Sequence, residues 1–107
     1  GYSRKGIADT DKRIAILPVG YADGFDRKLS NGVGEVFVNG KRAKLIGNVS
    51  MDLIMIDITG IEASEGDMVE IFGQNITISE MAEKLHTIPY EILTGISRRV
   101  KRVYFQE

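Results

Sequence analysis

Short apolar runs separated by glycine-containing turns dominate the chain. Alternating or continuous apolar runs rich in Val and Ile are typical of half-buried and buried strands. They predict six strands, over residues 13–20, 35–38, 41–46, 53–58, 68–72 and 100–105. Asn39-Gly40, between the second and third runs, is a strong signal for a two-residue hairpin. Strands this short and frequent indicate a mainly β fold, either a small closed barrel or a sandwich, rather than a parallel α/β sheet.

One segment departs from the strand pattern. Its apolar positions have helical spacing: Met81, Ala82 and Leu85. Thr77 or Ser79 would cap the N-terminus of this helix. Pro89 should end the helix, and residues 90–93 should add another turn. We therefore expect one or two short helices near residues 79–94 beside the six strands of the barrel or sandwich.

Residues 18–27 combine turn-forming and chemically active side chains. The first apolar run ends there in Ala22-Asp23-Gly24. This tripeptide predicts a tight turn, because glycine tolerates positive φ and aspartate accepts hydrogen bonds from nearby backbone amides. Such a turn would present Tyr21 and Arg27 to a ligand. A hairpin corner with a half-buried tyrosine accounts for the same residues without any function.

Length and composition restrict the class of function. The chain has 107 residues, of which 43% are apolar, as expected for one globular domain. Its 14 basic and 15 acidic residues give a formal net charge of −1, so no strong field attracts nucleic acid or an anionic membrane. The absence of cysteine excludes disulfides, thiolate metal sites and thiol nucleophiles. With no apolar stretch of membrane-spanning length and no signal peptide, we expect a soluble, cytoplasmic protein.

The chain offers few groups for catalysis on its own. Its single histidine, His86, falls at the end of the helical pattern, where a C-capping or surface role is expected. Gly32-Val33-Gly34 lacks the other elements of a phosphate-binding loop. The basic residues at 98–102 alternate with valine, which favours a strand or turn with solvated or paired charges over a nucleic-acid patch. We expect no metal site, and no activity from this chain alone.

Three segments, in order, resemble the C-terminal domain of alanine racemases. They are GYADG at residues 20–24, GNVSMD at 47–52 and IPYEILT at 88–94. The closing SRRVKRVY at 97–104 fits the same pattern, so the resemblance covers essentially all of residues 1–107. It implies a six-stranded, Greek-key-like β-barrel with one or two short helices near residues 79–94, in agreement with the strand pattern. It also implies a larger N-terminal barrel, absent from this chain, that carries pyridoxal phosphate and its lysine.

The resemblance implies that Tyr2, in Gly1-Tyr2-Ser3-Arg4, is a catalytic base. Racemisation removes an α-proton on one face of the amino acid and returns one on the other. In the family, the cofactor lysine serves one face and a tyrosine at this position serves the other. The spacing from Tyr2 to Tyr21 matches the family pattern, although Ser3 replaces the usual glycine. Because a phenol titrates near pH 10 in water, a neighbouring group must favour the phenolate.

The remaining site residues follow from the same resemblance. Tyr21 would gate the mouth of the substrate channel, with Arg27 further out. Met51 would donate its backbone N–H to the substrate carboxylate, a suitable ligand for an anion. Ile88 and Tyr90 would line the channel, and the Tyr90 hydroxyl would reach the cofactor phosphate.

Asn48 stands where many relatives carry arginine. The missing positive charge should weaken the attraction of carboxylates into the channel, which leaves the substrate preference more open.

In the resembling family the active site is shared between subunits. The barrel of one chain holds the cofactor, and the C-terminal domain of the partner supplies the tyrosine and the methionine amide. This arrangement implies a homodimer acting on a small amino acid. The implied activity is alanine racemisation, which supplies D-alanine for peptidoglycan. A related racemase for serine, lysine or ornithine is one alternative, and a non-catalytic β-barrel interaction module is another.

Overall fold

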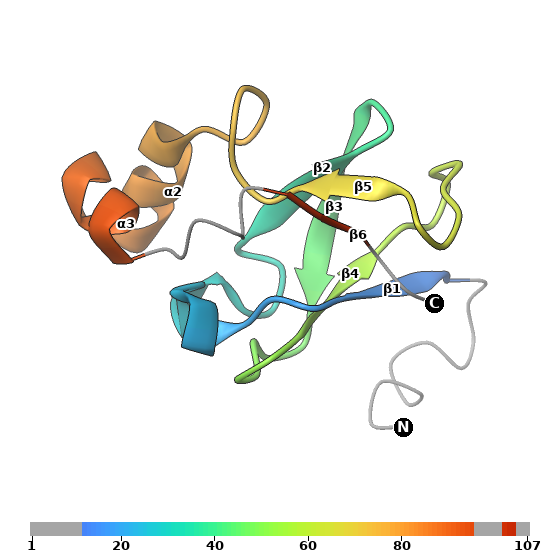
Figure 1. Cartoon of the computed structure of the whole chain (residues 1–107), viewed down its shortest axis with the longest axis horizontal. Helices are drawn as coiled ribbons and strands as arrows, with labels where there is room; N and C mark the ends of the chain where they lie inside the picture. The colour runs from blue at the N-terminus through green and yellow to red at the C-terminus, as the bar shows by residue number, and fades with distance from the viewer. Residues whose placement is uncertain (1–11, 96–101, 105–107) are drawn as a thin grey trace.

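The computed structural model describes residues 12–95 and 102–104, and it shows a curled antiparallel sheet with two short helices beside one end (Figure 1). The strands are β1 (Ile14–Leu17), β2 (Glu35–Val38), β3 (Lys41–Ile46), β4 (Ile54–Asp57), β5 (Met68–Glu70) and β6 (Arg102–Tyr104). The helices are α2 (Ile78–Leu85) and α3 (Pro89–Gly95), and two single 3₁₀ turns are η1 (Tyr21–Asp23) and η2 (Arg27–Leu29).

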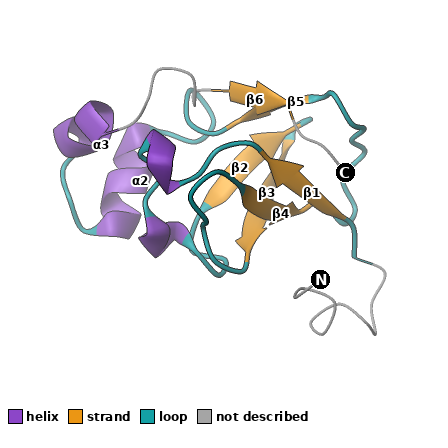
Figure 2. Ribbon diagram, turned by 60° about the horizontal axis from the view of Figure 1, so that its bottom comes forward, coloured by secondary structure: helices purple, strands orange, loops and turns teal. Residues whose placement is uncertain are grey.

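The strands follow the order β1-β4-β3-β2-β5-β6, and every neighbouring pair is antiparallel. Strands β2, β3 and β4 form a meander, and β5 returns beside β2, which is a Greek-key arrangement. The sheet curls into a half-barrel, and the helices lie to one side of it in both views (Figure 2). The prediction of a mainly β, Greek-key-like fold of six strands with two short helices is confirmed.

The hairpin between β2 and β3 has the predicted bounds and turn. Asn39 and Gly40 have φ angles of 47° and 85°, the pair of positive values that a two-residue hairpin of this type requires. The Asn39 side chain also donates hydrogen bonds to the Glu62 carbonyl at 2.8 Å and to Asp67 Oδ2 at 2.9 Å. The Ser64 amide and the Asn39 side chain together hold the pKa of Asp67 below its usual value. The hairpin tip is therefore tied to the loop before β5.

The core lies inside the curl of the sheet. Residues at alternating positions of the first three strands are buried: Ala15, Leu17, Val36, Val38, Ala43 and Leu45. In β4 the run Ile54-Met55-Ile56 is buried throughout, so both faces of this strand are covered. Phe25 and Leu29, each 1% exposed, come from the segment around η2 and belong to the same cluster as Met81 of α2.

Helix α2 begins and ends at identifiable caps. The Thr77 side chain accepts a hydrogen bond from the Glu80 amide at 3.1 Å, so Thr77 rather than Ser79 is the N-cap. The helix ends at His86, whose φ of 56° places it in the left-handed region. The prediction that Pro89 ends this helix was wrong: Pro89 is the first residue of α3, where its missing N–H costs nothing. Neither described helix has the length and apolar character needed to cross a membrane.

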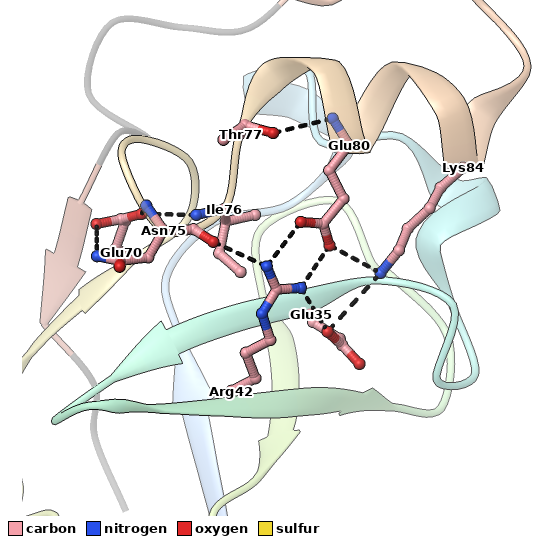
Figure 3. A network of polar contacts seen from close by, with 8 residues as sticks. All are labelled: Glu35, Arg42, Glu70, Asn75, Ile76, Thr77, Glu80 and Lys84. Atoms are coloured by element: carbon pink, nitrogen blue, oxygen red, sulfur yellow. Dashed lines mark hydrogen bonds and ion pairs between the residues drawn. The ribbon is translucent and has the colours of Figure 1, made fainter.

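A charged network attaches α2 to the hairpin (Figure 3). The two terminal nitrogens of Arg42, on β3, donate to the two carboxylate oxygens of Glu80 at 2.6 and 2.7 Å. Arg42 also donates to Glu35 at 2.9 Å and to the Asn75 carbonyl at 2.9 Å. Lys84 lies 3.4 Å from Glu80 and 3.9 Å from Glu35. These contacts raise the pKa of Arg42, with the Glu80 hydrogen bond as the main cause.

A second carboxylate shapes the loop between β5 and α2. Glu70, only 9% exposed, accepts hydrogen bonds from the backbone amides of Asn75 at 2.7 Å and Ile76 at 2.9 Å. The charged carboxylate thus satisfies two backbone amides of the loop that follows β5. Strand β5 ends at Glu70, two residues before the predicted end at residue 72.

The substitution Glu80→Gln should lower the free energy of unfolding of the chain by about 1 kcal/mol at neutral pH. The hydrogen bonds from Arg42 hold the pKa of Glu80 below its ordinary value of 4.5. A lowered folded-state pKa contributes stability above about pH 4.5, and that contribution is lost as the pH falls through the folded-state value. The gap between wild type and variant should therefore narrow in acid. Urea unfolding over a pH series measures it.

Glu83→Gln is the matched control, because Glu83 is an exposed carboxylate of the same helix and forms no ion pair within the described part of the chain. It should change the stability by less than about 0.5 kcal/mol. A gap for Glu80→Gln that stays constant down to pH 3 would contradict the assigned role of the Arg42 pair.

Candidate functional site

Two loops that leave the same end of the half-barrel are joined through their backbones. Leu17 of β1 pairs with Ile54 of β4, so the loop after β1 and the loop before β4 emerge side by side. The Tyr21 amide donates to the Ser50 carbonyl at 3.0 Å, and the Ala22 amide donates to the Met51 carbonyl at 3.0 Å. The segments singled out by sequence at 20–24 and 47–52 therefore form one surface.

Gly20 permits this approach. A Cβ atom at position 20 would lie 2.2 Å from the Ser50 carbonyl oxygen and 2.5 Å from the Met51 carbonyl oxygen. Both distances are shorter than a non-bonded contact between carbon and oxygen allows. The φ of Gly20 is −155°, an extended value that any residue adopts, so the requirement is for space rather than for backbone conformation. Glycine at this position is needed because another backbone occupies the place of a side chain.

The predicted tight turn positions Tyr21. Asp23 Oδ2 accepts a hydrogen bond from the Gly20 amide at 3.1 Å, and Gly24 has a φ of 95°. Both agree with the prediction made from Ala22-Asp23-Gly24. The turn leaves Tyr21 43% exposed, and the Arg27 guanidinium carbon lies 5.2 Å from the centre of its ring. This cation–π contact holds two of the predicted channel residues together.

The same loops line a pocket of about 850 Å³ that is open to solvent. Three residues predicted from sequence line it: Tyr21, Arg27 and Asn48. Lys28 adds a second cation to the wall and Asp26 a single carboxylate. The groups that line the pocket thus include cationic, amide and phenol donors, which suits a small polar ligand carrying a negative charge.

Met51 belongs to the joined loops and is 52% exposed, but it does not line the 850 Å³ pocket. Its carbonyl is used by the Ala22 amide, whereas its own amide donates to no acceptor among residues 12–95 and 102–104. A backbone N–H without a partner at an exposed loop is suited to receive an anionic ligand group. The prediction that Met51 offers its main chain, rather than its side chain, is compatible with this geometry and stays a prediction.

Ile88 and Tyr90 lie at the junction of α2 and α3, with exposures of 62% and 72%. They do not line the 850 Å³ pocket. A smaller pocket beside α3 shares Gly24, Asp26 and Lys28 with it, so the helix pair adjoins the same wall. Their assignment to the substrate channel stays a prediction, because the part of the chain described here does not bring them to Tyr21.

Tyr2, predicted as the catalytic base, lies outside the described residues. The basic cluster at 98–101 also falls there, while Arg102 belongs to β6.

The described residues could contribute to a cofactor site only from its edge. All five of the lysines in this part of the chain are exposed or half-buried: Lys12, Lys28, Lys41, Lys44 and Lys84. None is enclosed as a lysine bonded to a cofactor would be. Within the same residues, no three His, Asp or Glu side chains gather in a way that could hold a metal ion. The arrangement can bind and orient a ligand that another segment holds.

Comparison with known proteins places this arrangement in a family. The family described as "Alanine racemase, C-terminal domain" matches residues 1–104. The chain belongs to the alanine racemase C-terminal domain family. Alanine racemase 2 of Caldanaerobacter subterraneus subsp. tengcongensis is 50% identical over an alignment of 108 positions, which covers 96% of this chain. The alanine racemase of Alteromonas mediterranea is 47% identical over 104 residues, also 96% of this chain.

Solved structures of alanine racemases share the fold. The Clostridium difficile 630 enzyme matches with a TM-score of 0.79 and 39% identity, over 94% of this chain and 26% of the other. The Bartonella henselae alanine racemase, solved with covalently bound pyridoxal phosphate, matches with a TM-score of 0.74 and 39% identity, over 82% and 25%. The chain spans only 28% and 29% of the two curated relatives named above.

Hydrogen bonds that the sequence did not predict brace the two loops of this racemase domain. Ser30 Oγ accepts a hydrogen bond from the Val49 amide at 2.8 Å, and the Asn31 amide donates to the Gly47 carbonyl at 2.8 Å. The Asn31 side chain donates to Asn48 Oδ1 at 3.3 Å, which leaves the amide nitrogen of Asn48 as a donor. The turn-forming Ser-Asn-Gly at 30–32 was the available signal, and the φ of 56° at Asn31 fits it.

Gly20→Ala should destabilise the racemase domain by about 3 kcal/mol and separate the two loops, since the new methyl group meets backbone that cannot move cheaply. Urea unfolding measures the loss, and hydrogen exchange at the Tyr21 and Ala22 amides should report the broken contacts.

Gly95→Ala is the control for this prediction, because a Cβ there meets nothing within 4 Å. It should change the stability by about 1 kcal/mol or less, with no effect on exchange at Tyr21. Equal unfolding curves for Gly20→Ala and wild type would disprove the proposed role of the close approach.

Proposed function

We propose that this chain is the C-terminal part of a pyridoxal-phosphate-dependent alanine racemase that interconverts L- and D-alanine. The observation that carries the proposal is the pair of backbone hydrogen bonds from Tyr21 to Ser50 and from Ala22 to Met51. These bonds bring the Tyr21 phenol and the Met51 amide to one pair of joined loops. Relatives at 47% and 50% identity carry the name alanine racemase, which supports the same reaction.

The cofactor is proposed to be held by an N-terminal barrel, absent from this chain, with this domain approaching from outside. When bound, pyridoxal phosphate delocalises the negative charge left at Cα after proton removal. Because the described lysines are exposed or half-buried, we propose that this domain does not itself bond the cofactor. The covalently bound pyridoxal phosphate in the Bartonella henselae enzyme supports the choice of cofactor. The exposed Tyr90 hydroxyl is proposed to contact the cofactor phosphate.

Four residues would act on the substrate. Tyr2 is proposed as the base that exchanges the α-proton of L-alanine, and the Met51 amide as the donor to the substrate carboxylate. Tyr21 and Arg27 would form a gate, since both line the pocket and are joined by their cation–π contact. Ile88 and Asn48 are proposed as further residues of the channel.

A homodimer with a shared active site accounts for a domain that offers polar groups without enclosing a cofactor. The donors face an open pocket, so a partner surface would be needed to exclude water from the reacting atoms. We further propose a cytoplasmic enzyme whose product, D-alanine, serves peptidoglycan synthesis.

Tyr2→Phe in the full-length protein should reduce the rate of conversion of L-alanine to D-alanine by about 100-fold or more, because it removes the general base for one face. Visible absorbance of the bound cofactor should be retained, which shows that the site still assembles. Tyr104→Phe, at the one tyrosine of the sequence without a proposed role in the site, serves as the control, with an unchanged rate. Unchanged racemisation by Tyr2→Phe would reject the assigned base and favour the non-catalytic alternative.

A substrate panel separates the proposed enzyme from related racemases. Alanine should have a kcat/KM at least about 10-fold above serine, lysine and ornithine, because a fitted pocket discriminates against an added hydroxyl or methylene group by roughly that factor or more. Steady-state assays of the full-length protein with each L-amino acid measure this ratio. A higher value for lysine or ornithine would transfer the proposal to the related class, in line with the uncharged Asn48 in the pocket.

A further inference from the structure

The clasp formed by Arg42, Glu80 and Asn75 joins parts of the chain that no strand pairing joins. Arg42 comes from β3, an inner strand of the sheet. Its guanidinium donates to both carboxylate oxygens of Glu80 on α2 and to the Asn75 carbonyl just before that helix (Figure 3). With Glu35 included, the planar guanidinium engages four acceptor atoms, which fixes direction as well as distance. Position and rotation of α2 on the hairpin are therefore both constrained.

The helix that the clasp holds also packs beside the pocket. Met81 of α2, which is 4% exposed, lines a small cavity together with Phe25 and Leu29. Leu29 is the last residue of η2, and Phe25 lies just before η2. Since η2 also carries Arg27, one face of α2 contacts the segment that lines the 850 Å³ pocket. A movement of α2 would be transmitted to this wall.

The second helix follows the first as a unit. The Thr87 amide donates to the Ala82 carbonyl at 2.9 Å, and the Thr87 hydroxyl donates to Glu91 of α3. These bonds span the junction at which Ile88 and Tyr90 lie. Both of those side chains are mostly exposed, so their location is set by the helix pair rather than by packing of their own.

We propose that Arg42 is a positioning residue of the active site: its clasp on Glu80 and Asn75 sets where α2 and α3 present Ile88 and Tyr90 relative to the Tyr21 gate. This inference rests on the proposed function. Arg42 itself does not line the pocket, so it acts through the helix pair and touches no substrate. The fork is required as well as the charge, because a lysine cannot bind both oxygens of Glu80 and the Asn75 carbonyl in one plane.

The test compares Arg42→Gln, Arg42→Lys and the control Lys44→Gln in the full-length protein. Lys44 is two residues along β3 on the same face, exposed, and makes no ion pair within the described residues. Hydrogen exchange of the amides at 78–92 is one measurement. The other is kcat and KM for L-alanine, at a temperature where every variant is folded.

Arg42→Gln should accelerate exchange at 78–92 by about 10-fold or more while leaving the β1 and β4 amides unchanged. It should lower kcat/KM for L-alanine by about 10-fold, as expected for misplaced contacts to substrate and cofactor. Arg42→Lys should recover only part of both effects, and Lys44→Gln should resemble wild type. Glu80→Gln should reproduce Arg42→Gln, and the double variant should lose little more.

Two results would overturn the inference. Unchanged hydrogen exchange at 78–92 in Arg42→Gln would show that the Arg42 contacts do not hold the helices, whether or not the wild-type protein racemises alanine. Accelerated exchange with unchanged kcat/KM in an active enzyme would leave Arg42 a purely structural role. A wild-type protein that racemises no amino acid would instead reject the proposed function, while the exchange measurement would still report on the clasp.

Discussion

The contact between the Gly20 backbone and the carbonyls of Ser50 and Met51 decides where the functional groups of this domain lie. Strand pairing between β1 and β4 brings the two loops to the same end of the half-barrel. The final approach needs a residue without a side chain, because the opposing backbone occupies the Cβ position of Gly20. Two amide hydrogen bonds then convert proximity into a defined geometry. Side chains carried by such a frame are held within a small positional tolerance.

The domain joins two kinds of structure by different forces. The half-barrel is held by strand pairing and a continuous apolar core, which is insensitive to pH. The helix pair contributes apolar side chains to that core, but its orientation depends on the ion network around Arg42. Screening by salt and protonation of carboxylates act on the second attachment and spare the first. The helical side of the pocket is therefore the more adjustable one.

Strand positions could be predicted because each depends on local apolar pattern and turn residues. Asn39-Gly40 is the clearest instance, since its two positive φ angles are a property of the dipeptide itself. The role of Pro89 was misjudged because proline fits both just after one helix and at the start of the next. Only the left-handed His86, which ends α2 earlier, decides between these two roles.

The site could be predicted in part from resemblance and hardly at all from local pattern. Tyr21, Arg27 and Asn48 were expected to act together, and they line one pocket. The brace by Ser30 and Asn31 and the clasp by Arg42 were missed, because their partners lie far away in the sequence. Polar residues at exposed positions give no signal for a distant partner until the topology is known.

The β2–β3 hairpin has a consequence for the order in which the chain assembles. Its two-residue turn closes with little loss of chain entropy, so the hairpin and the adjoining meander are suited to form on the microsecond scale. The union of the Gly20 and Met51 loops must wait until β1 has paired across the intervening meander with β4. The joined surface of these two loops would then be completed late in folding and lost early in unfolding, so partial denaturation would separate the loops before the sheet disappears.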